Sequence, residues 1–327
     1  MKAWQVYQNA APREALRLAE VERPEPGPGQ VLVRVLASAL NFPDVLLCLG
    51  QYQMKPPLPF TPGLELCGEV VALGEGVSGF SPGDRVLGNP ILPGGAFAEY
   101  ALMDIADTFT APAALDDEAA ACLHIAYQTA WFGLHRRAHL QSGETLLVHA
   151  GAGGVGSAAI QVGRAAGARV IAVVGGAAKA EVATKLGADV VIDRREQDFV
   201  AAVKEATGGH GADVVFDPVG GEAYTGSAKC VAFEGRILVV GFAGGTVPAP
   251  PLNHALVKNY SIVGLHWGLY QQRDPGAIAE CHAELTRLVA AGTIRPLISE
   301  RLTLADVPDG LRRLAAGDTI GRLVFLP

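Results

Sequence analysis

Three glycines have the spacing of a phosphate-binding turn. Gly151, Gly153 and Gly156 match the pattern G-x-G-x-x-G, after an apolar run at 145–149 and before a run at 155–166 with helical periodicity. Between a strand and a helix, the first glycine permits a tight turn, the second lets the backbone approach a pyrophosphate, and the third lets helix and strand pack closely. The N–H groups and the dipole of the helix N-terminus then face the phosphates. The candidate cofactor-binding residues of this turn are Gly151, Gly153, Gly154, Val155 and Gly156.

The chain after the next strand indicates which dinucleotide this turn would bind. Proteins that bind the unphosphorylated cofactor place Asp or Glu about 20 residues beyond the motif, where it holds the ribose hydroxyls. No carboxylate lies at 173–179, where Gly176 leaves room for a 2′-phosphate and Lys179 could reach it. Arg194 or Arg195, after the third strand, supplies a second cation. We therefore predict a preference for NADPH over NADH; the alternative is that these cations are only solvated side chains.

Strands and helices alternate through the middle of the chain and would hold this turn in place. Short β-branched runs are separated by stretches of helical periodicity, which is typical of a doubly wound parallel sheet covered on both faces. The strands are predicted at 145–149, 169–174, 189–193, 213–217, 236–240 and 261–265, and the helices at 155–166, 177–186, 199–206 and 221–231. The sequence thus predicts an α/β fold with a Rossmann-type sheet in this part of the chain.

The two ends of the chain have a different pattern. Up to about residue 120, short alternating runs are broken by Gly and Pro, which favours an antiparallel, barrel-like β domain. After residue 265 we expect helices at 274–291 and 307–316, and a final strand at 322–326 that returns to the first domain. The predicted domains are therefore 1–123 with 266–327, which is catalytic, and 124–265, which binds the cofactor.

Composition and charge exclude several classes of protein. Half of the 327 residues are hydrophobic and only 18% are charged, which argues against a disordered chain. The formal charge of −7 and the absence of a basic run make nucleic acid an unlikely partner. The same features give no basic segment that would bind an anionic membrane. No apolar run approaches the ~20 residues of a membrane span, and the first residues lack a secretory pattern, so we expect a cytoplasmic protein. The five cysteines contain no C-x-x-C pair and are expected to be reduced, buried thiols.

Motifs along nearly the whole chain resemble one known family. They are Asn-Phe-Pro-Asp-Val-Leu at 41–46, Gly-Gln-Tyr at 50–52, Pro-Gly-Leu-Glu-Leu-Cys-Gly at 62–68, Gly-Asp-Arg-Val at 83–86, Gly-Gly-Ala-Phe-Ala-Glu-Tyr at 94–100, the glycine turn, Asp-Pro-Val-Gly-Gly at 217–221, Val-Val-Gly-Phe-Ala-Gly-Gly at 239–245 and His-Trp-Gly at 266–268. The chain resembles the medium-chain dehydrogenase/reductases, and among them the zinc-free quinone oxidoreductases related to zeta-crystallin. This resemblance implies a GroES-like β-barrel domain beside the Rossmann domain, NADP(H) as cofactor, and a homodimer formed through 261–265.

The resemblance also bears on metal chemistry. In the zinc alcohol dehydrogenase branch, a cysteine stands at the place of Asn41 and a histidine at the place of Leu64, and neither ligand is present here. A catalytic zinc site needs at least three nitrogen, sulfur or carboxylate ligands, so we expect no metal. Without a Lewis acid, alcohol oxidation is disfavoured. Conjugated carbonyls, meaning quinones or activated alkenes, are the expected hydride acceptors.

Catalytic roles follow from the same resemblance. Asn41, Tyr52 and Thr129 would face the nicotinamide or its ribose, and Tyr52 could give a hydrogen bond or a proton to the reduced atom. Asp44 would only brace the loop. No acid–base dyad is visible in the sequence, so the expected mechanism is hydride transfer by positioning, in a cleft between the two domains.

The resemblance further implies a flat, apolar acceptor pocket. Phe42, Trp267 and Tyr270 would form its walls, and core packing is the alternative for Phe42 and Trp267. The end of the predicted strand at 236–240 should also pass close to the cofactor. The residues expected there are Gly241, Phe242 and Ala243.

Three functions remain open from the sequence. The first is an NADPH-dependent reductase that transfers hydride to quinones without zinc. The second is a reductase of the double bond in alkenals, enones or enoyl thioesters, on the same scaffold. The third, from another class, is a cofactor-binding structural or RNA-associating protein; the charge of −7 argues against RNA.

Overall fold

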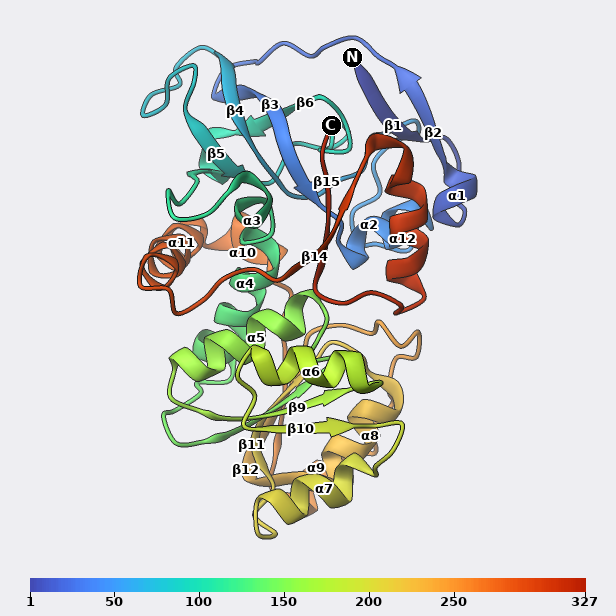
Figure 1. Cartoon of the computed structure of the whole chain (residues 1–327), viewed down its shortest axis with the longest axis vertical. Coiled ribbons are helices and arrows are strands. Elements are labelled where there is room, and N and C mark those ends of the chain that lie inside the picture. The colour runs from blue at the N-terminus through green and yellow to red at the C-terminus, as the bar shows by residue number, and fades with distance from the viewer. The chain divides into compact units, whose positions relative to one another are not determined.

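The chain folds into two compact units. The computed structural model describes residues 1–327. Residues 1–125 and 295–327 form the first unit, and residues 126–294 form the second. Figure 1 colours the first unit blue to teal, with a red C-terminal segment, and the second unit green to orange. The sequence predicts the return to the first domain at residue 266, whereas the structure keeps 266–294 in the second unit. The functional division into catalytic and cofactor domains stays a prediction.

The first unit is built on a mostly antiparallel sheet with the order β14-β15-β3-β4-β5-β7, in which β6 also pairs with β3 and only β14 and β15 are parallel. Strands β1 and β2 form a separate two-stranded antiparallel sheet of this unit. Its strands are β1 (Lys2–Val6), β2 (Leu16–Glu20), β3 (Gln30–Ala39), β4 (Leu66–Leu73), β5 (Arg85–Gly88), β6 (Tyr100–Asp104), β7 (Thr108–Thr110), β14 (Ile298–Leu302) and β15 (Arg322–Phe325). Its helices are α1 (Pro12–Ala15), α2 (Phe42–Cys48), α3 (Asp117–Ala121) and α12 (Val307–Ala315), with 3-10 turns at Ile105–Asp107 and Leu304–Asp306. The antiparallel pairing of β15 with β3 confirms that the end of the chain returns to this unit (Figure 1).

The second unit is a six-stranded parallel sheet with the order β10-β9-β8-β11-β12-β13. Its strands are β8 (Thr145–His149), β9 (Arg169–Val174), β10 (Val190–Asp193), β11 (Ala212–Asp217), β12 (Val231–Val239) and β13 (Ser261–Gly264). Its helices are α5 (Gly154–Ala165), α6 (Ala177–Lys185), α7 (Phe199–Ala206), α8 (Gly221–Cys230), α9 (Leu252–Lys258), α10 (Gly268–Arg273) and α11 (Pro275–Ala290). Helix α4 (His124–Trp131) begins in the first unit and continues into the second as a π-helix, Phe132–Arg137. The doubly wound parallel sheet predicted from the sequence is confirmed.

The parallel strands are buried because helices cover the sheet. Leu147, Ile171, Val215 and Ile237 lie on β8, β9, β11 and β12, and each is at most 2% exposed. They pack in one cluster with residues of α7, α8 and α9. β-Branched and leucine side chains on strands covered in this way bury apolar surface, and this burial is the main favourable contribution to the free energy of folding of the sheet.

The cysteines and the apolar character of the helices bear on two predictions from the sequence. All five cysteines are buried and none is paired, as predicted. Burial raises the pKa of Cys48, Cys67 and Cys122 to about 12, so these thiols are neutral and unreactive at neutral pH. No helix of the structure has the length and apolar character that a membrane crossing requires.

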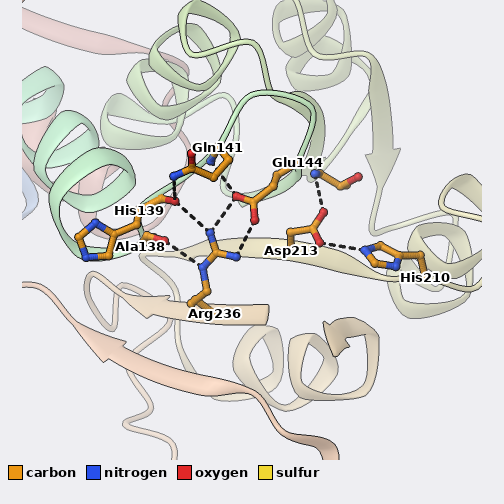
Figure 2. Close-up of polar contacts among 8 residues, drawn as sticks. Ala138, His139, Gln141, Glu144, His210, Asp213 and Arg236 are labelled. Carbon is orange, nitrogen blue, oxygen red and sulfur yellow. Dashed lines mark hydrogen bonds and ion pairs between the residues drawn. The ribbon is translucent and has the colours of Figure 1, made fainter. Parts of the chain in front are cut away.

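An ion pair fixes the end of the sheet at which β8 and β12 begin (Figure 2). Both guanidinium Nη atoms of Arg236 lie 2.8 Å from the carboxylate oxygens of Glu144, and its Nε donates to the carbonyl of Ala138. Burial disfavours the charged form of Glu144, but the hydrogen bonds from Arg236 and from the Gln141 N–H prevail and hold the pKa of Glu144 below its usual value. The pair therefore stabilises the unit mainly when Glu144 is ionised.

We expect Arg236→Met to lower the free energy of unfolding by about 2 kcal/mol at neutral pH, because the bidentate pair is lost and Glu144 stays partly buried. The pKa of Glu144 is depressed in the folded state, so this contribution is present above the unfolded pKa and is lost as the pH falls through the folded one. Urea unfolding at neutral pH and near pH 3 measures both effects.

The matched control for this substitution is Arg287→Met. Arg287 pairs with Glu284 on α11, and its side chain is 65% exposed. Surface pairs contribute little, so its effect on the free energy of unfolding should be much smaller than that of Arg236→Met at either pH. Equal destabilisation by the two variants would contradict the role given to Arg236.

Candidate cofactor and active site

The glycine turn leaves the N-terminus of α5 open. Strand β8 ends at His149, Ala150 adopts a φ of 51°, and the N–H of Gly151 donates to the carbonyl of Val173 at 3.1 Å. Helix α5 begins after Gly153, and no side chain caps it. The first N–H groups of a helix have no partner within the helix, so those of α5 are available to an anionic ligand.

Packing requires glycine at two positions of this turn. A Cβ on Gly156 would collide with the carbonyl oxygen of Ala150. A Cβ on Gly151 would lie 3.0 Å from the Cβ of Ala172 on β9. A Cβ on Gly153 would meet only one atom, the carbonyl oxygen of Ala150 at 3.2 Å. The first and third glycines therefore serve strand–helix packing, while the second leaves the face above the turn uncovered, as the motif requires.

Two guanidinium groups lie over the turn that follows β9. A Cβ on Gly175 would lie 3.3 Å from Nε of Arg194, and one on Gly176 would lie 3.1 Å from Nη1 of Arg195. Gly176 has a φ of 103° and precedes α6, in whose first turn Lys179 lies. The two predicted arginines thus lie against the Gly175–Gly176 backbone, and Lys179 follows in the first turn of α6.

A carboxylate that sequence reasoning missed lies at the same turn. Asp193, the last residue of β10, accepts hydrogen bonds from the N–H groups of Gly176 at 2.9 Å and Arg195 at 3.0 Å. These two donors hold the pKa of Asp193 below its usual range. The motif places a ribose-binding carboxylate at the end of β9, but Asp193 ends the neighbouring strand and pairs with Val174 across the parallel ladder. An acidic residue at the end of that next strand could have been identified from the sequence, since the carboxyl ends of parallel strands meet at one edge.

The loop at 241–244 lies against the end of β11. The N–H of Ala243 donates to Pro218 at 3.0 Å, and that of Gly244 donates to Val219 at 2.9 Å. The Asp217 carboxylate accepts from the N–H groups of Val219 and Gly220, which shapes the facing loop. Phe242 is 38% exposed. The predicted residues of this loop thus lie at the carboxyl edge of the sheet, as the glycine turn does.

In the first unit, Asn41 belongs to a buried polar network. Its N–H donates to Asp44 at 2.8 Å, and its amide nitrogen donates to Glu65 at 2.9 Å and to the carbonyl of Ala39 at 3.1 Å. Glu65 also accepts from the N–H of Ile125 and forms an ion pair with Arg322. The resemblance pointed to Asn41 and Asp44, whereas Glu65 and Arg322 were missed.

Asp44 holds two turns of the backbone together. One carboxylate oxygen accepts from Asn41 and the other accepts from the N–H of Gly63 at 3.1 Å. Burial raises the pKa of Asp44 to about 7, although these N–H donors and Arg322 favour the ionised form. Burial, and then the Asp44 charge, raise the pKa of Tyr52, so its phenol stays protonated at neutral pH. The signal for this turn was Asn41-Phe42-Pro43-Asp44, a helix start with an acidic side chain at its third position.

The other residues predicted for the acceptor pocket and the nicotinamide side are buried or half-buried. Phe42 is the first residue of α2 and is half-buried. Trp267 is only 8% exposed, and its indole N–H donates to the Gln128 side chain at 3.2 Å. Tyr270 is half-buried and packs on Phe132, with ring centroids 4.4 Å apart. Thr129 lies on α4 and is 7% exposed. None of these positions by itself assigns a role toward substrate or cofactor.

The structure offers no donor set for zinc. At the two family ligand positions, the Asn41 amide nitrogen is committed to Glu65 and Ala39, and Leu64 has no donor atom. No group of three or more His, Cys, Asp or Glu side chains in the chain is arranged to hold a metal ion. The residues present therefore do not fit a zinc ion.

Comparisons with known proteins agree with this fold. Residues 27–113 match the family model described as alcohol dehydrogenase GroES-like domain, and residues 154–283 match the model described as zinc-binding dehydrogenase. A quinone oxidoreductase-like protein 2 homolog from Nematostella vectensis is 39% identical over 304 residues, which cover 91% of this chain and 82% of that protein. The mouse quinone oxidoreductase-like protein 2 is 36% identical, over 96% of this chain and 89% of that protein.

A solved structure is similar over the full length of both chains. It is the Escherichia coli quinone oxidoreductase complexed with NADPH, with a TM-score of 0.93 and 30% identity over 100% of each chain. The similarity therefore extends over both compact units described above. The chain belongs to the medium-chain dehydrogenase/reductase superfamily, in its quinone oxidoreductase-like branch.

Proposed function

We propose that this protein is an NADPH-dependent reductase that transfers hydride to quinones without zinc. The observation that carries the cofactor assignment is the pair of guanidinium groups over Gly175 and Gly176, beside the uncapped N-terminus of α5. The acceptor class rests on the names of the relatives and on the missing zinc ligands. Without a Lewis acid to stabilise the alcoholate, alcohol oxidation is disfavoured, whereas quinones accept hydride readily.

NADPH would supply the hydride, and the second unit would bind it. The open N-terminus of α5 takes the pyrophosphate, through the residues Gly151, Gly153, Gly154, Val155 and Gly156. Gly176, Lys179 and Arg194 take the 2′-phosphate. Thr129 and the backbone of Gly241, Phe242 and Ala243 serve the nicotinamide side.

The first unit would supply the polar groups for the reaction. Asn41 is held by Glu65, so its side chain has one fixed orientation. Tyr52 donates a hydrogen bond to the reduced oxygen, and its raised pKa keeps the proton on the phenol across neutral pH. Asp44 fixes the N–H groups of Asn41 and Gly63 and acts as a positioning residue. Phe42, Trp267 and Tyr270 form the apolar walls of the acceptor pocket. Positioning and exclusion of water are then the main sources of rate.

A homodimer through β13 (Ser261–Gly264) is also proposed. This strand ends the sheet order and pairs only with β12, so one of its edges is unpaired. Ile262 on β13 is 40% exposed, and Leu256 and Val257 on the preceding helix are 77% and 76% exposed. An exposed apolar sheet edge is a surface on which a second copy can continue the sheet.

For the cofactor, Arg194→Ala should raise the dissociation constant of NADPH about tenfold and leave that of NADH nearly unchanged, because only NADPH carries the 2′-phosphate. Titration of the protein with each nucleotide, followed by fluorescence, measures this ratio. Arg169→Ala is the matched control, since it removes one exposed arginine from the other end of β9. Comparable affinity for NADH and NADPH in the unaltered protein, unchanged in Arg194→Ala and Lys179→Ala, would contradict the preference.

For the acceptor, NADPH oxidation should be fast with 9,10-phenanthrenequinone and 1,4-benzoquinone and slow with a 2-alkenal or crotonyl-CoA. Tyr52→Phe should lower kcat with quinones about tenfold or more while leaving NADPH affinity unchanged, because the hydrogen bond to the reduced oxygen is lost. Turnover that favours the alkenal or the thioester would instead identify a double-bond reductase. Tight NADPH binding without any turnover would identify a cofactor-binding protein.

For the assembly, Ile262→Lys should convert the dimer to a monomer, because it places a charge on the edge that the two copies share. Light scattering during size-exclusion chromatography measures the mass of each species. Lys2→Glu, on β1 of the first unit, is a charge-changing control that should leave the dimer intact. A monomer in the unaltered protein at micromolar concentration would refute this interface.

A further inference from the structure

A cavity lies at the edge of the parallel sheet opposite the glycine turn. It has a volume of about 330 Å³ and is lined by Lys204, Gly209, His210, Gly211, Lys229, Cys230, Val231, Phe233 and Lys258. Gly211 directly precedes β11, and Val231 is the first residue of β12. The glycine turn instead follows the last residue of β8. Strands rise about 3.3 Å per residue, so the six residues of β11 separate the two edges by about 20 Å. This cavity is therefore not part of the cofactor site.

The lining of the cavity is positive. Three lysines and one histidine contribute to it, and no Asp or Glu does. None of the three lysines forms an ion pair with a carboxylate. The ring of His210 is held by the Asp213 carboxylate at 2.8 Å, which in turn accepts from the Thr145 N–H (Figure 2). In a chain with a net charge of −7, this is a local concentration of positive charge.

The dipole of each helix explains why a lysine lies in its last turn, but it does not explain why three such lysines line one cavity. Lys204, Lys229 and Lys258 lie in the last turns of α7, α8 and α9, where the negative end of a helix favours a cation. The Lys258 ammonium indeed donates to the carbonyl of Ala228 at 2.8 Å. However, burial and the nearby charge of Lys204 lower the pKa of Lys258. The like charges therefore repel one another, and an anion between them would remove that cost.

The rim of the cavity is aromatic. Phe233 lines it with a side chain that is 67% exposed, on the stretch of β12 that precedes Glu234. The loop residues from Gly209 to Gly211 form one wall, and Gly211 is required there because a Cβ would lie 2.5 Å from the carbonyl oxygen of Cys230. An exposed ring beside several cations suits a ligand that has both a flat base and phosphate groups. The volume lies at the lower end of the range for small-molecule sites.

We propose that this lysine cavity is a second nucleotide site, which holds the phosphates of a mononucleotide between Lys204, Lys229 and Lys258 and stacks its base on Phe233. The site is separate from the glycine turn and does not rest on the reductase activity. Its ligand is small, because the cavity has a volume of only about 330 Å³.

The test is the binding of ADP, measured by isothermal titration calorimetry on the full chain. The Gly153→Glu variant, whose side chain would cover the open N-terminus of α5 with a negative charge, should still bind one ADP. Adding Lys204→Met and Lys258→Met to that background should weaken ADP binding by about tenfold or more, because two charge-assisted contacts are lost. Phe233→Ala should weaken ADP binding but not pyrophosphate binding, because only ADP has a base to stack.

The matched control for charge is Lys185→Met with Lys2→Met in the same background, since both lysines lie outside the cavity. This control should bind ADP as tightly as its parent. Thermal unfolding of each variant without ligand establishes that it is folded, and Lys204→Met alone serves if the loss of the Lys258–Ala228 contact is destabilising. Unchanged ADP affinity in the cavity variants, or no ADP binding once the cofactor turn is altered, would overturn the proposal. So would binding of single-stranded RNA by the cavity lysines at concentrations where ADP does not bind.

Discussion

The buried carboxylate of Glu65 is the group on which the first unit depends. It is fully buried, and its partners are the Asn41 amide at 2.9 Å, the Ile125 N–H at 2.9 Å and the Arg322 guanidinium. An uncompensated buried charge costs several kcal/mol, so these three segments must meet at Glu65 in the folded state. Burial raises the pKa of Glu65, and the Arg322 charge opposes that rise. The C-terminal strand thus belongs to this unit for an electrostatic reason as well as for its ladder with β3.

The same carboxylate determines what Asn41 can do. Because both the N–H and the amide nitrogen of Asn41 are already bonded, the side chain is fixed before any ligand arrives. In the zinc-dependent branch of the superfamily a metal ligand stands at this position, whereas here a neutral amide is held by a carboxylate. Polar groups fixed in this way can orient a substrate without reorganising, which is the condition under which positioning contributes to rate.

The sequence predicted the second unit better than the first. Its strands are continuous β-branched runs and its helices are periodic, so local pattern and tertiary structure agree for most elements from Thr145 to Gly264. The exceptions are α9, which was not predicted, and β12, which begins at Val231 rather than at residue 236. The first unit contains short elements, such as α2, and contacts that no local pattern encodes: Glu65 and Arg322 are 257 residues apart. Asp193 was missed for a similar reason, because its hydrogen bonds reach a turn on the neighbouring strand. The predicted roles toward substrate stay predictions, since they concern ligands rather than folding.

Parallel topology also explains why the two proposed phosphate sites are built differently. In a doubly wound sheet the crossover helices begin at the carboxyl edge of the strands and end at the amino edge. At the carboxyl edge, the open N–H groups and dipole of α5 attract phosphate without a charged side chain, and arginines are needed only for a second phosphate. At the amino edge, the negative ends of α7, α8 and α9 would repel an anion. A phosphate site can exist there only if the positive charge of lysine side chains exceeds the negative partial charge of the helix ends. Lys204, Lys229 and Lys258 supply such charge at this edge.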